Sequence, residues 1–437
     1  MLKAAISRRV SSFITSRGLR NFLRSIHALR RRLTGRAPVV HYFHQADDPY
    51  SHLAAQLLEP LAARYKVKIV TWVVPAPEKA AAPEYELLAA YGRRDAARVA
   101  REYGLDFPDG AGAPDPQLVR RVTALLARAA GTDRFAELAV AAGRALWTGD
   151  GAALGRLQEE HGVAGEKDTA AELAKGNQMR RKLGHYLSGM FSFEGEWYWS
   201  ADRLNYLEER LAEAGLESER GKPMLAPWRD LTLGPVPAST RRPVIDYWFS
   251  FRSPYSWISV PRMLKLARHY NAELRLRFVL PMVMRGLPVP LTKRMYIVRD
   301  TKREAERAGL PFGKVVDSVG AGAARALAVL HHAIPLGKGE AFAELGCKAV
   351  FADGIDIASD AGLMDVAQRA GLGEETVRKA LADPSWEAAV EENRQALFEA
   401  GLWGVPSFRV DGRPAHWGQD RFWALEQDII ASLTENP

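Results

Sequence analysis

The stretch Ser253-Pro254-Tyr255-Ser256 follows an apolar run, Val244–Phe249, and it decides the fold because the chain contains this pattern twice. Pro49-Tyr50-Ser51 stands 205 residues earlier and follows the apolar run Val39–Phe43. Proline suits the first position of a helix, where its missing N–H costs nothing. The pattern therefore predicts two equivalent units, in each of which a short strand leads through a turn into a helix.

Two further blocks extend this repeat along the chain. Tyr91 to Arg98 matches Tyr296 to Arg303 at the same offset of 205. Trp199-Ser-Ala-Asp202-Arg203 matches Trp417-Gly-Gln-Asp420-Arg421 at an offset of 218. Three blocks in one order, two of them at one offset, indicate an internal duplication, with about 13 extra residues in the middle of the second copy.

Each copy continues with a second strand, a long Ala-rich helical region, a hairpin and a last helix. We expect second strands at Val67–Val74 and Leu274–Leu280, hairpins at Glu194-Gly195 and Asp411-Gly412, and last helices from Asp202 and Asp420. This order predicts the α/β fold class, with two tandem thioredoxin-like domains that each carry an inserted helical subdomain. The expected boundaries are an N-terminal segment at 1–37, a first domain at 38–215, a Pro-rich linker at 216–242 and a second domain at 243–437.

The positive charge of the chain is concentrated at one end. The 437 residues include 60 Lys and Arg against 52 Asp and Glu, a formal charge of +8. Ten of the basic residues lie within Met1–Arg36, which has no acidic residue, so the remainder is close to neutral. We therefore expect no nucleic-acid partner, since such partners need a basic surface on the folded body.

The apolar residues of that basic segment recur every three or four positions, which predicts an amphipathic helix broken near Gly18. Three interpretations stay open: a membrane-surface anchor, a docking helix for a partner, or a mostly disordered basic tail. The Arg-rich, acid-free pattern is also typical of a transit peptide. The sequence has neither a spanning apolar run nor a secretory signal, so we expect a cytoplasmic protein, with peripheral membrane contact through residues 1–36 as one alternative.

The single cysteine, Cys347, excludes an internal disulfide and any dithiol exchange within the chain. It stands in an Ala-rich helical stretch, which favours a buried structural thiol. A disulfide oxidoreductase is therefore not expected.

Candidate site residues gather in three motifs of the second copy. Ser253 suits a helix N-cap, and the same hydroxyl at a helix N-terminus also suits an anion. Pro406, within Gly404-Val405-Pro406, fits an edge strand or the cis proline that thioredoxin-like folds place opposite the first helix. Gln419 and Asp420 precede the last helix, where Asp420 suits an N-cap and Gln419 a solvated side chain.

As a set, these residues resemble the family of 2-hydroxychromene-2-carboxylate isomerases and kappa-class glutathione transferases, within the DsbA-like thioredoxin superfamily. The resemblance spans residues 243–437. It rests on Ser253-Pro254-Tyr255-Ser256, Lys293-x-x-Tyr296-x-x-x-Asp300-x-x-Arg303, Gly404-Val405-Pro406 and Gly418-Gln419-Asp420-Arg421.

The resemblance implies glutathione as the cofactor, and we expect no metal site. It implies backbone pairing of the tripeptide at Val405 beside Pro406, and contacts to the γ-glutamyl end from Gln419 and Asp420. Lys293 would face the glycine carboxylate. Arg252 and Arg285 are further candidates for carboxylate partners, because the stretch after the second strand lacks the family's asparagine.

The resemblance also implies that Ser253 acts as the catalytic residue by hydrogen-bonding the glutathione sulfur. A thiol of pKa near 8.5 is only about 3% thiolate at pH 7, and lowering that pKa by two units needs about 2.7 kcal/mol. A helix N-terminus supplies roughly 0.3–2 kcal/mol. A hydrogen bond to a charged acceptor supplies about 1.5–3 kcal/mol. Together they meet the requirement without a protein cysteine.

The first copy differs at each of these positions and so provides an internal comparison. Asp48 stands at the position of Ser253, Gly189 at that of Pro406, Ala201 at that of Gln419 and Leu88 at that of Lys293. We therefore predict a degenerate first domain. Asp300, Arg303 and Arg421 have counterparts in both copies, which indicates a scaffold role.

The sequence thus predicts a glutathione-dependent isomerase or transferase that acts on a small electrophilic or unsaturated substrate. A chromene-type aromatic compound is the substrate class that the resemblance implies. The alternative is a non-catalytic thioredoxin-like scaffold whose N-terminal helix binds a membrane or a partner. A homodimer and a pairing of the two domains within one chain both remain open.

Overall fold

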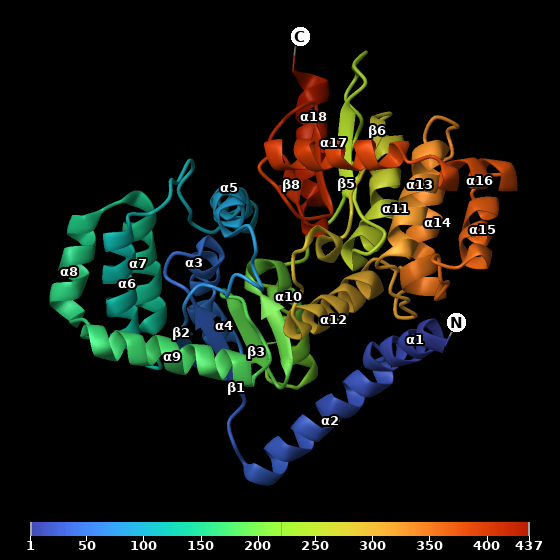
Figure 1. Cartoon of the computed structure of the whole chain (residues 1–437). Helices are drawn as coiled ribbons and strands as arrows, with labels where there is room; N and C mark the ends of the chain where they lie inside the picture. The colour runs from blue at the N-terminus through green and yellow to red at the C-terminus, as the bar shows by residue number, and fades with distance from the viewer. Residues whose placement is uncertain (1, 220, 436–437) are drawn as a thin grey trace. The chain divides into compact units, whose positions relative to one another are not determined.

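The structure is a computed structural model that describes residues 2–219 and 221–435. It divides into two compact units (Figure 1). The first unit is Asn21–Trp228, and the second is Met1–Arg20 together with Arg229–Pro437. Each unit contains one copy of the repeat, and each is described separately below.

The first unit is built on a four-stranded mixed sheet in the order β2-β1-β3-β4. Strands β1 and β2 are parallel, and the remaining neighbours are antiparallel. The helices α3 and α4 connect β1 to β2, and α10 follows β4. The bounds are β1 Val39–His44, α3 Pro49–Ala55, α4 Leu58–Arg64, β2 Lys68–Val73, β3 Met190–Phe193, β4 Glu196–Trp199 and α10 Ser200–Glu213.

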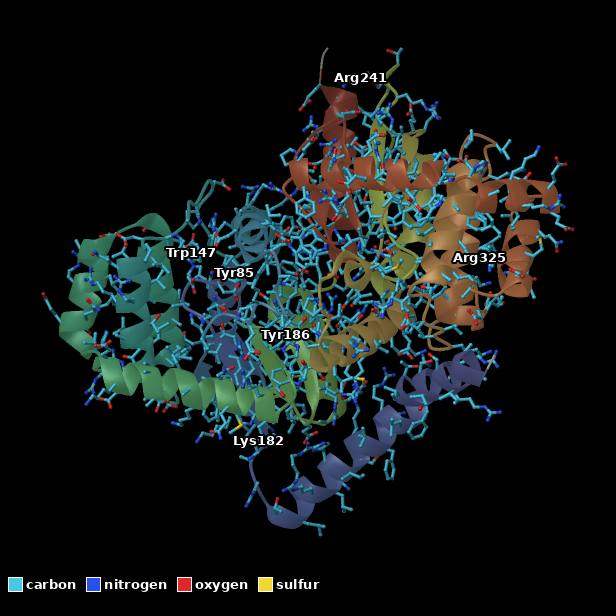
Figure 2. All side chains as sticks on the ribbon, viewed as in Figure 1. Tyr85, Trp147, Lys182, Tyr186, Arg241 and Arg325 are labelled. Atoms are coloured by element: carbon cyan, nitrogen blue, oxygen red, sulfur yellow. The ribbon has the colours of Figure 1, made fainter. Side chains whose placement is uncertain are left out.

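A helical insertion separates β2 from β3 in the first unit. It consists of α5 Tyr85–Tyr103, α6 Pro116–Ala129, α7 Phe135–Thr148, α8 Gly151–His161 and α9 Glu166–Lys182. Its apolar faces join the core beneath the sheet, where Leu53, Phe135 and Phe191 are fully buried. Trp147, labelled in Figure 2, lies at the end of α7 and packs against the ring of Phe107.

The second unit repeats this arrangement with a sheet in the order β6-β5-β7-β8. The framework elements are β5 Val244–Phe249, α11 Pro254–His269, β6 Glu273–Phe278, β7 Ser407–Val410, β8 His416–Trp417, η3 Gln419–Arg421 and α18 Phe422–Thr434. The segment between β6 and β7 comprises η1 Met282–Arg285, α12 Leu291–Arg307, α13 Ala321–Ala333, α14 Gly339–Lys348, the π-helical turn η2 Ala349–Asp353, α15 Asp360–Arg369, α16 Glu374–Ala382 and α17 Ser385–Glu399.

The strand registers preserve the offset of the repeat. Val39 pairs with Lys68 in the first sheet, and Val244 pairs with Glu273 in the second. Both partners are displaced by 205 residues, so the two sheets carry the same parallel pair in the same register. The predicted fold class, two tandem thioredoxin-like domains with helical insertions, is confirmed.

Two details of the prediction are wrong. Asp420 does not cap the last helix, because residues 419–421 form a tight 3₁₀ turn and α18 begins at Phe422. Asp202 likewise lies inside the first turn of α10, which starts two residues earlier at Ser200. The predicted hairpin at Asp411-Gly412 is present, with residues 411–415 as the loop between β7, which ends at Val410, and β8, which begins at His416.

The basic N-terminal segment forms two helices, α1 Leu2–Ile14 and α2 Arg17–Thr34. The predicted break near Gly18 is present at residues 15–16, where the Ser16 hydroxyl accepts a hydrogen bond from the Leu19 N–H at 3.1 Å and starts the second helix. Among the helices that the structure describes, none combines the length and the hydropathy that a membrane-spanning helix requires.

Candidate functional site

The predicted sulfur-binding residue lies at the N-terminus of α11. Ser253 has extended backbone angles, Pro254 occupies the first helical position, and the Ser253 Oγ accepts a hydrogen bond from the Ser256 N–H at 3.2 Å. The N-cap that the sequence predicts is therefore present. The side chain is only partly buried, so the hydroxyl lies at a polar helix end that also favours an external anion.

A cis peptide bond lies opposite this helix end. The bond joins Val405 to Pro406, as expected from the thioredoxin-like order. The Ser253 hydroxyl donates to the Val405 carbonyl oxygen at 3.3 Å, so the two predicted motifs are in direct contact. Among the described residues, the Val405 N–H has no hydrogen-bond partner, which leaves it available to an extended peptide.

Close packing fixes the backbone just before that bond. A Cβ atom at Gly404 would lie 2.4 Å from Cζ2 of Trp417, so only glycine fits there. The indole rings of Trp403 and Trp417 lie 5.2 Å apart, measured between centroids. The turn at Gly404 therefore packs closely against β8 through the rings of Trp403 and Trp417.

The predicted carboxylate-binding lysine lies beside this turn. The Lys293 ammonium nitrogen is 5.7 Å from the centroid of the Trp403 ring, a cation–π distance. Burial lowers the pKa of Lys293 to about 8. Burial disfavours the charged ammonium group, and an anionic ligand beside it would favour the charged form again. Lys293 is therefore suited to bind an anion.

Gln419 is buried, and both ends of its amide have partners within the chain. Its Oε1 accepts from Arg262 Nη1 at 2.6 Å, and its Nε2 donates to Glu304 Oε2 at 2.7 Å and to Asp420 Oδ1. The Gly418 N–H donates to the Pro406 carbonyl at 2.9 Å and ties this turn to the cis bond. The structure therefore brings Gln419 and Asp420 to the same end of the sheet as Ser253 and Pro406.

The two arginines suggested as further carboxylate partners already have partners. Arg252 forms a two-pronged ion pair with Asp317 at 2.7 and 3.2 Å. Arg285 donates to the Trp403 carbonyl at 3.0 Å. Arg252 is therefore held by Asp317, and Arg285 stabilises the turn that precedes Pro406.

Three residues that sequence reasoning missed support the predicted ones: Arg262, Glu304 and Trp403. Trp403 directly precedes Gly404, so its position was visible in the motif. Arg262 and Glu304 lie on different helices, α11 and α12, and only the fold brings them to Gln419. A comparison of the two copies could have identified Arg262 and Glu304, because the first copy has apolar residues, Leu57 and Val99, at the equivalent positions.

The equivalent helix end of the first unit is closed by the chain itself. The Asp48 carboxyl group accepts from the Tyr50 and Ser51 N–H groups and from the Ser51 and Ser188 hydroxyls, with distances between 2.6 and 3.2 Å. Burial raises the pKa of Asp48 against the lowering effect of these hydrogen bonds. Gly189 approaches so closely that a Cβ atom there would lie 3.4 Å from Asp48 Oδ2.

Gln45 also contributes to filling the N-terminal end of α3. Gln45 donates from Nε2 to Asp47 at 2.9 Å and to the Tyr85 hydroxyl at 3.0 Å, and its Oε1 accepts from Ser188 at 3.0 Å. Tyr85, labelled in Figure 2, begins α5. The helix end of the first unit is thus filled by its own polar groups.

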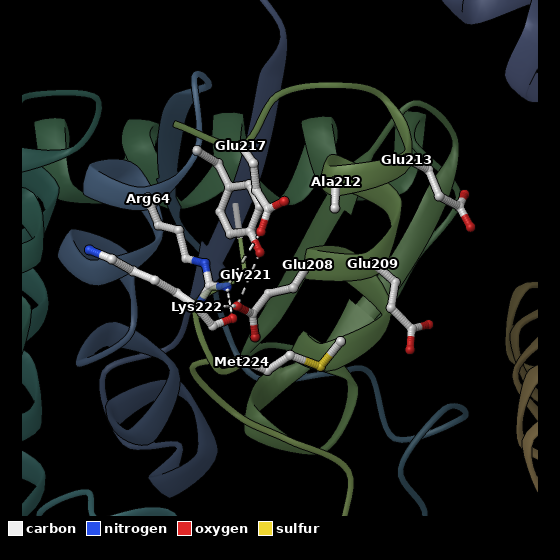
Figure 3. A pocket seen from close by; sticks show the side chains of 10 residues that line it. Arg64, Glu208, Glu209, Ala212, Glu213, Glu217, Gly221, Lys222 and Met224 are labelled. Carbon is white, nitrogen blue, oxygen red and sulfur yellow. Dashed lines mark hydrogen bonds and ion pairs between the residues drawn. The ribbon is translucent and has the colours of Figure 1, made fainter. Parts of the chain in front are cut away.

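The first unit also has an open pocket of 340 Å³ at the end of α4 (Figure 3). Arg64 contributes to its wall and lies 3.7 Å from Glu208 and 3.4 Å from Glu217. The Glu208 carboxylate accepts from the Leu225 and Ala226 N–H groups. These charges hold the start of the linker against α10, so the pocket has a structural explanation and contains none of the predicted site residues.

Cys347 is fully buried, and burial raises its pKa well above the usual range. The predicted structural thiol is confirmed. The chain has no second cysteine, so it forms no internal disulfide.

The second unit is similar to known proteins. Residues 244–430 match the family model of the DSBA-like thioredoxin domain. A 2-hydroxychromene-2-carboxylate isomerase of Pseudomonas sp. (strain C18) is 24% identical over 196 residues, which cover 43% of this chain and 90% of the relative. The isomerase of the same name from Pseudomonas putida is 26% identical over 206 residues, which cover 44% of this chain and 97% of that protein.

The second unit is also similar to a solved structure. A structure of 2-hydroxychromene-2-carboxylate isomerase is 22% identical and matches with a TM-score of 0.37, covering 42% of this chain and 93% of its own.

Proposed function

Because its second unit is a DsbA-like thioredoxin domain, we propose that this chain is a glutathione-dependent enzyme that isomerises or conjugates a small electrophilic substrate. One observation carries the proposal. The Ser253 hydroxyl lies at the N-terminus of α11 and 3.3 Å from the Val405 carbonyl, beside the cis bond to Pro406. The curated relatives of this unit are isomerases.

The residues present fit glutathione. The Val405 N–H is without a hydrogen-bond partner among the described residues, and an extended tripeptide supplies a carbonyl to it, as an added strand does. Lys293 supplies a partly buried cation for the glycine carboxylate. Asp420 supplies a carboxylate for the γ-glutamyl ammonium group, with Gln419 beside it to contact or orient this end.

The protein's part in the chemistry is to hold negative charge on sulfur. Bound glutathione supplies a nucleophilic sulfur that adds reversibly to an unsaturated carbon, which permits rotation about a former double bond or, without reversal, conjugation. Ser253 donates its hydroxyl to that sulfur in place of the Val405 carbonyl, and the first turn of α11 adds its dipole. A substrate of the chromene type fits the names of the relatives.

The first unit is proposed to be non-catalytic. The groups that would receive an anion at its helix end already bind the Asp48 carboxyl group. A Cβ-free Gly189 stands in place of the cis proline, so the peptide-binding edge is also altered.

The test is a calorimetric titration of the full chain with glutathione, combined with ultraviolet titration of the bound thiol. We expect binding with a thiol pKa lowered by about two units, and Ser253→Ala should raise it by about one to two units. Asp48→Asn, at the equivalent position of the first unit, is the matched control and should leave both measurements unchanged. Failure to bind at millimolar glutathione would contradict the enzyme proposal. Binding with an unmoved pKa in Ser253→Ala would contradict the role of Ser253.

A further inference from the structure

The N-terminal helices turn their apolar faces away from the protein. Along α2, Phe22, Ile26, Leu29 and Leu33 are spaced by three or four residues and therefore share one face. Their exposed fractions run from 45% to 79%. A surface helix of a globular protein normally buries such a face, so this arrangement is inverted.

The opposite face of α2 binds the first unit through charges. Arg24 forms two hydrogen bonds to the Glu196 carboxylate, at 2.6 and 2.9 Å, and one to Glu213 at 2.8 Å. About two turns further on, Arg31 pairs with Glu194 on the same face of the helix. Both arginines are about one-fifth exposed, and they lie on the side of the helix away from the apolar face.

The first helix shows the same inversion against the second unit. The Ser7 hydroxyl donates to the Val315 carbonyl at 3.0 Å, and the Ser11 hydroxyl accepts from the Val315 N–H at 2.9 Å. On the other side of α1, Ile6, Val10 and Phe13 are more than half exposed. Small polar side chains thus hold this helix, and its large apolar side chains face outward.

This segment accounts for a large share of the exposed apolar surface. Fifteen large apolar residues are exposed in the described part of the chain, and eight lie within residues 6–33: Ile6, Val10, Phe13, Phe22, Leu23, Ile26, Leu29 and Leu33. Contiguous apolar patches on proteins mark sites of interaction with proteins or membranes.

The charges beside the apolar face of α2 favour a membrane over a protein as the surface that it contacts. Arg30 and Arg32 each lie one position from an apolar-face residue, Leu29 or Leu33, and so flank the face on its two sides. Arg9 has a similar place on α1. All three are exposed and form no ion pair with any residue that the structure describes. Residues 1–36 contain no acidic residue. An anionic lipid membrane, with apolar acyl chains beneath negatively charged headgroups, matches an apolar helix face flanked by arginines. The apolar stems of the arginine side chains extend along the acyl layer, and their guanidinium groups reach the phosphates.

We propose that residues 4–33 are an interfacial anchor that inserts its apolar faces into an anionic lipid surface. The arginines of the inner face, Arg24 and Arg31, hold α2 to the first unit. The arginines of the flanks, Arg30 and Arg32, bind the headgroups. The enzyme activity proposed for Ser253 plays no part in this binding.

The test is flotation of the full chain with vesicles of phosphatidylcholine alone and with about 30 mol% phosphatidylserine added. We expect binding to the anionic vesicles at least about 10-fold stronger than to the neutral ones, and a loss of most of that difference at high salt. Phe22→Ser combined with Ile26→Ser should weaken binding by at least about 10-fold. Arg30→Gln combined with Arg32→Gln should reduce only the anionic component.

A matched control uses two exposed apolar residues outside this segment, Val163 and Leu336. Val163→Ser combined with Leu336→Ser should bind vesicles like the native chain. Equal binding by the Phe22/Ile26 variant and the native chain would overturn the proposal, as would absence of binding to anionic vesicles at low salt. Self-association of the chain that the Phe22/Ile26 variant abolishes, without vesicle binding, would assign the face to a protein partner and also overturn it. Because the substituted side chains are exposed, circular dichroism should show an unchanged fold.

Discussion

The N-termini of α3 and α11 are the same turn in two chemical versions. In the first unit Asp48 accepts from the Ser188 hydroxyl at 2.9 Å, and in the second unit Ser253 donates to the Val405 carbonyl at 3.3 Å. Ser188 and Val405 are equivalent residues, so the same pair of positions is in contact with the donor and acceptor exchanged. One turn binds a carboxyl group of its own chain, and the other presents a hydroxyl.

The units also differ behind this turn, in a buried set of three side chains. In the second unit Arg262, Glu304 and Gln419 form a hydrogen-bonded chain. In the first unit the same positions hold Leu57, Val99 and Ala201, which are all buried. A polar set has therefore been exchanged for an apolar set as a whole, as expected when one unpaired polar group in a core would be costly. The change from Gln419 to Ala201 thus reports on packing as well as on ligand contact.

Exchanging the two versions of the turn should give the largest effect. Ser253→Asp removes a donor from the proposed thiolate and adds a negative charge, so we expect the dissociation constant for glutathione to rise by more than about 100-fold. Aspartate is as good an N-cap as serine, so the fold should persist. Calorimetry measures the affinity, and thermal unfolding checks the fold.

The reverse exchange is its control. Asp48→Ser should create no glutathione site in the first unit, because Gly189 and Leu88 remain in place of the cis proline and the lysine. A loss of less than about 3-fold in Ser253→Asp would show that no thiolate is held there.

The buried set of three provides the next test. Gln419→Ala should lower the free energy of unfolding by about 2–3 kcal/mol, since Arg262 and Glu304 lose partners in a buried place. The triple variant Arg262→Leu, Glu304→Val, Gln419→Ala restores the apolar set of the first unit. It should cost less than the sum of the three single variants by about 1–2 kcal/mol.

Urea unfolding measures these costs, and glutathione titration of the same variants separates two roles for Gln419. If the triple variant regains stability and binds glutathione like the native chain, Gln419 is a packing residue. Additive costs would contradict the idea that the set was exchanged as a unit.

A feature shared by both units should give equal and smaller effects. The Tyr50 hydroxyl donates to Asp95 at 2.6 Å, and the Tyr255 hydroxyl donates to Asp300 at 2.8 Å. Tyr50→Phe and Tyr255→Phe should each cost about 1–2 kcal/mol, because the buried carboxylates lose one partner. Hydrogen exchange reports on each unit separately. Unequal costs, or a change in glutathione affinity with Tyr255→Phe, would contradict a purely structural role.

The sequence predicted those parts of the molecule that depend on local pattern and on the repeat. The strands before Pro49 and Pro254, the cis bond at Pro406 and the burial of Cys347 follow from spacing and residue type. The closure around Asp48 could not be predicted, because Gln45, Ser188 and Tyr85 come from separate elements. The contacts of Gln419 were missed for the same reason. The sequence predicted the amphipathic pattern of α1 and α2 but not which way the two faces turn, because the carboxylates and backbone groups that the polar side binds are brought within reach only by the fold.

Lys293 gives the smallest expected effect and a pH signature. Burial lowers the pKa of Lys293 to about 8, below the ordinary value of about 10.4 that holds in the unfolded chain. Between these values the unfolded chain binds a proton that the folded chain does not, so stability falls as the pH is lowered from about 10 to about 8 and stays constant below. Lys293→Leu, the residue of the first unit at this position, removes this penalty and should raise the free energy of unfolding at pH 7 by about 1 kcal/mol.

The same variant should weaken glutathione binding by about 5-fold, because the glycine carboxylate loses its cation. S-methylglutathione, whose sulfur does not titrate, is the probe for the pH dependence. Its affinity for the native chain should decrease as the pH rises through about 8, and the Lys293→Leu variant should lack this step. Stabilisation without any loss of affinity would leave Lys293 as a tolerated buried cation and remove it from the site, and the contrast between Lys293 and Leu88 would then reflect packing alone.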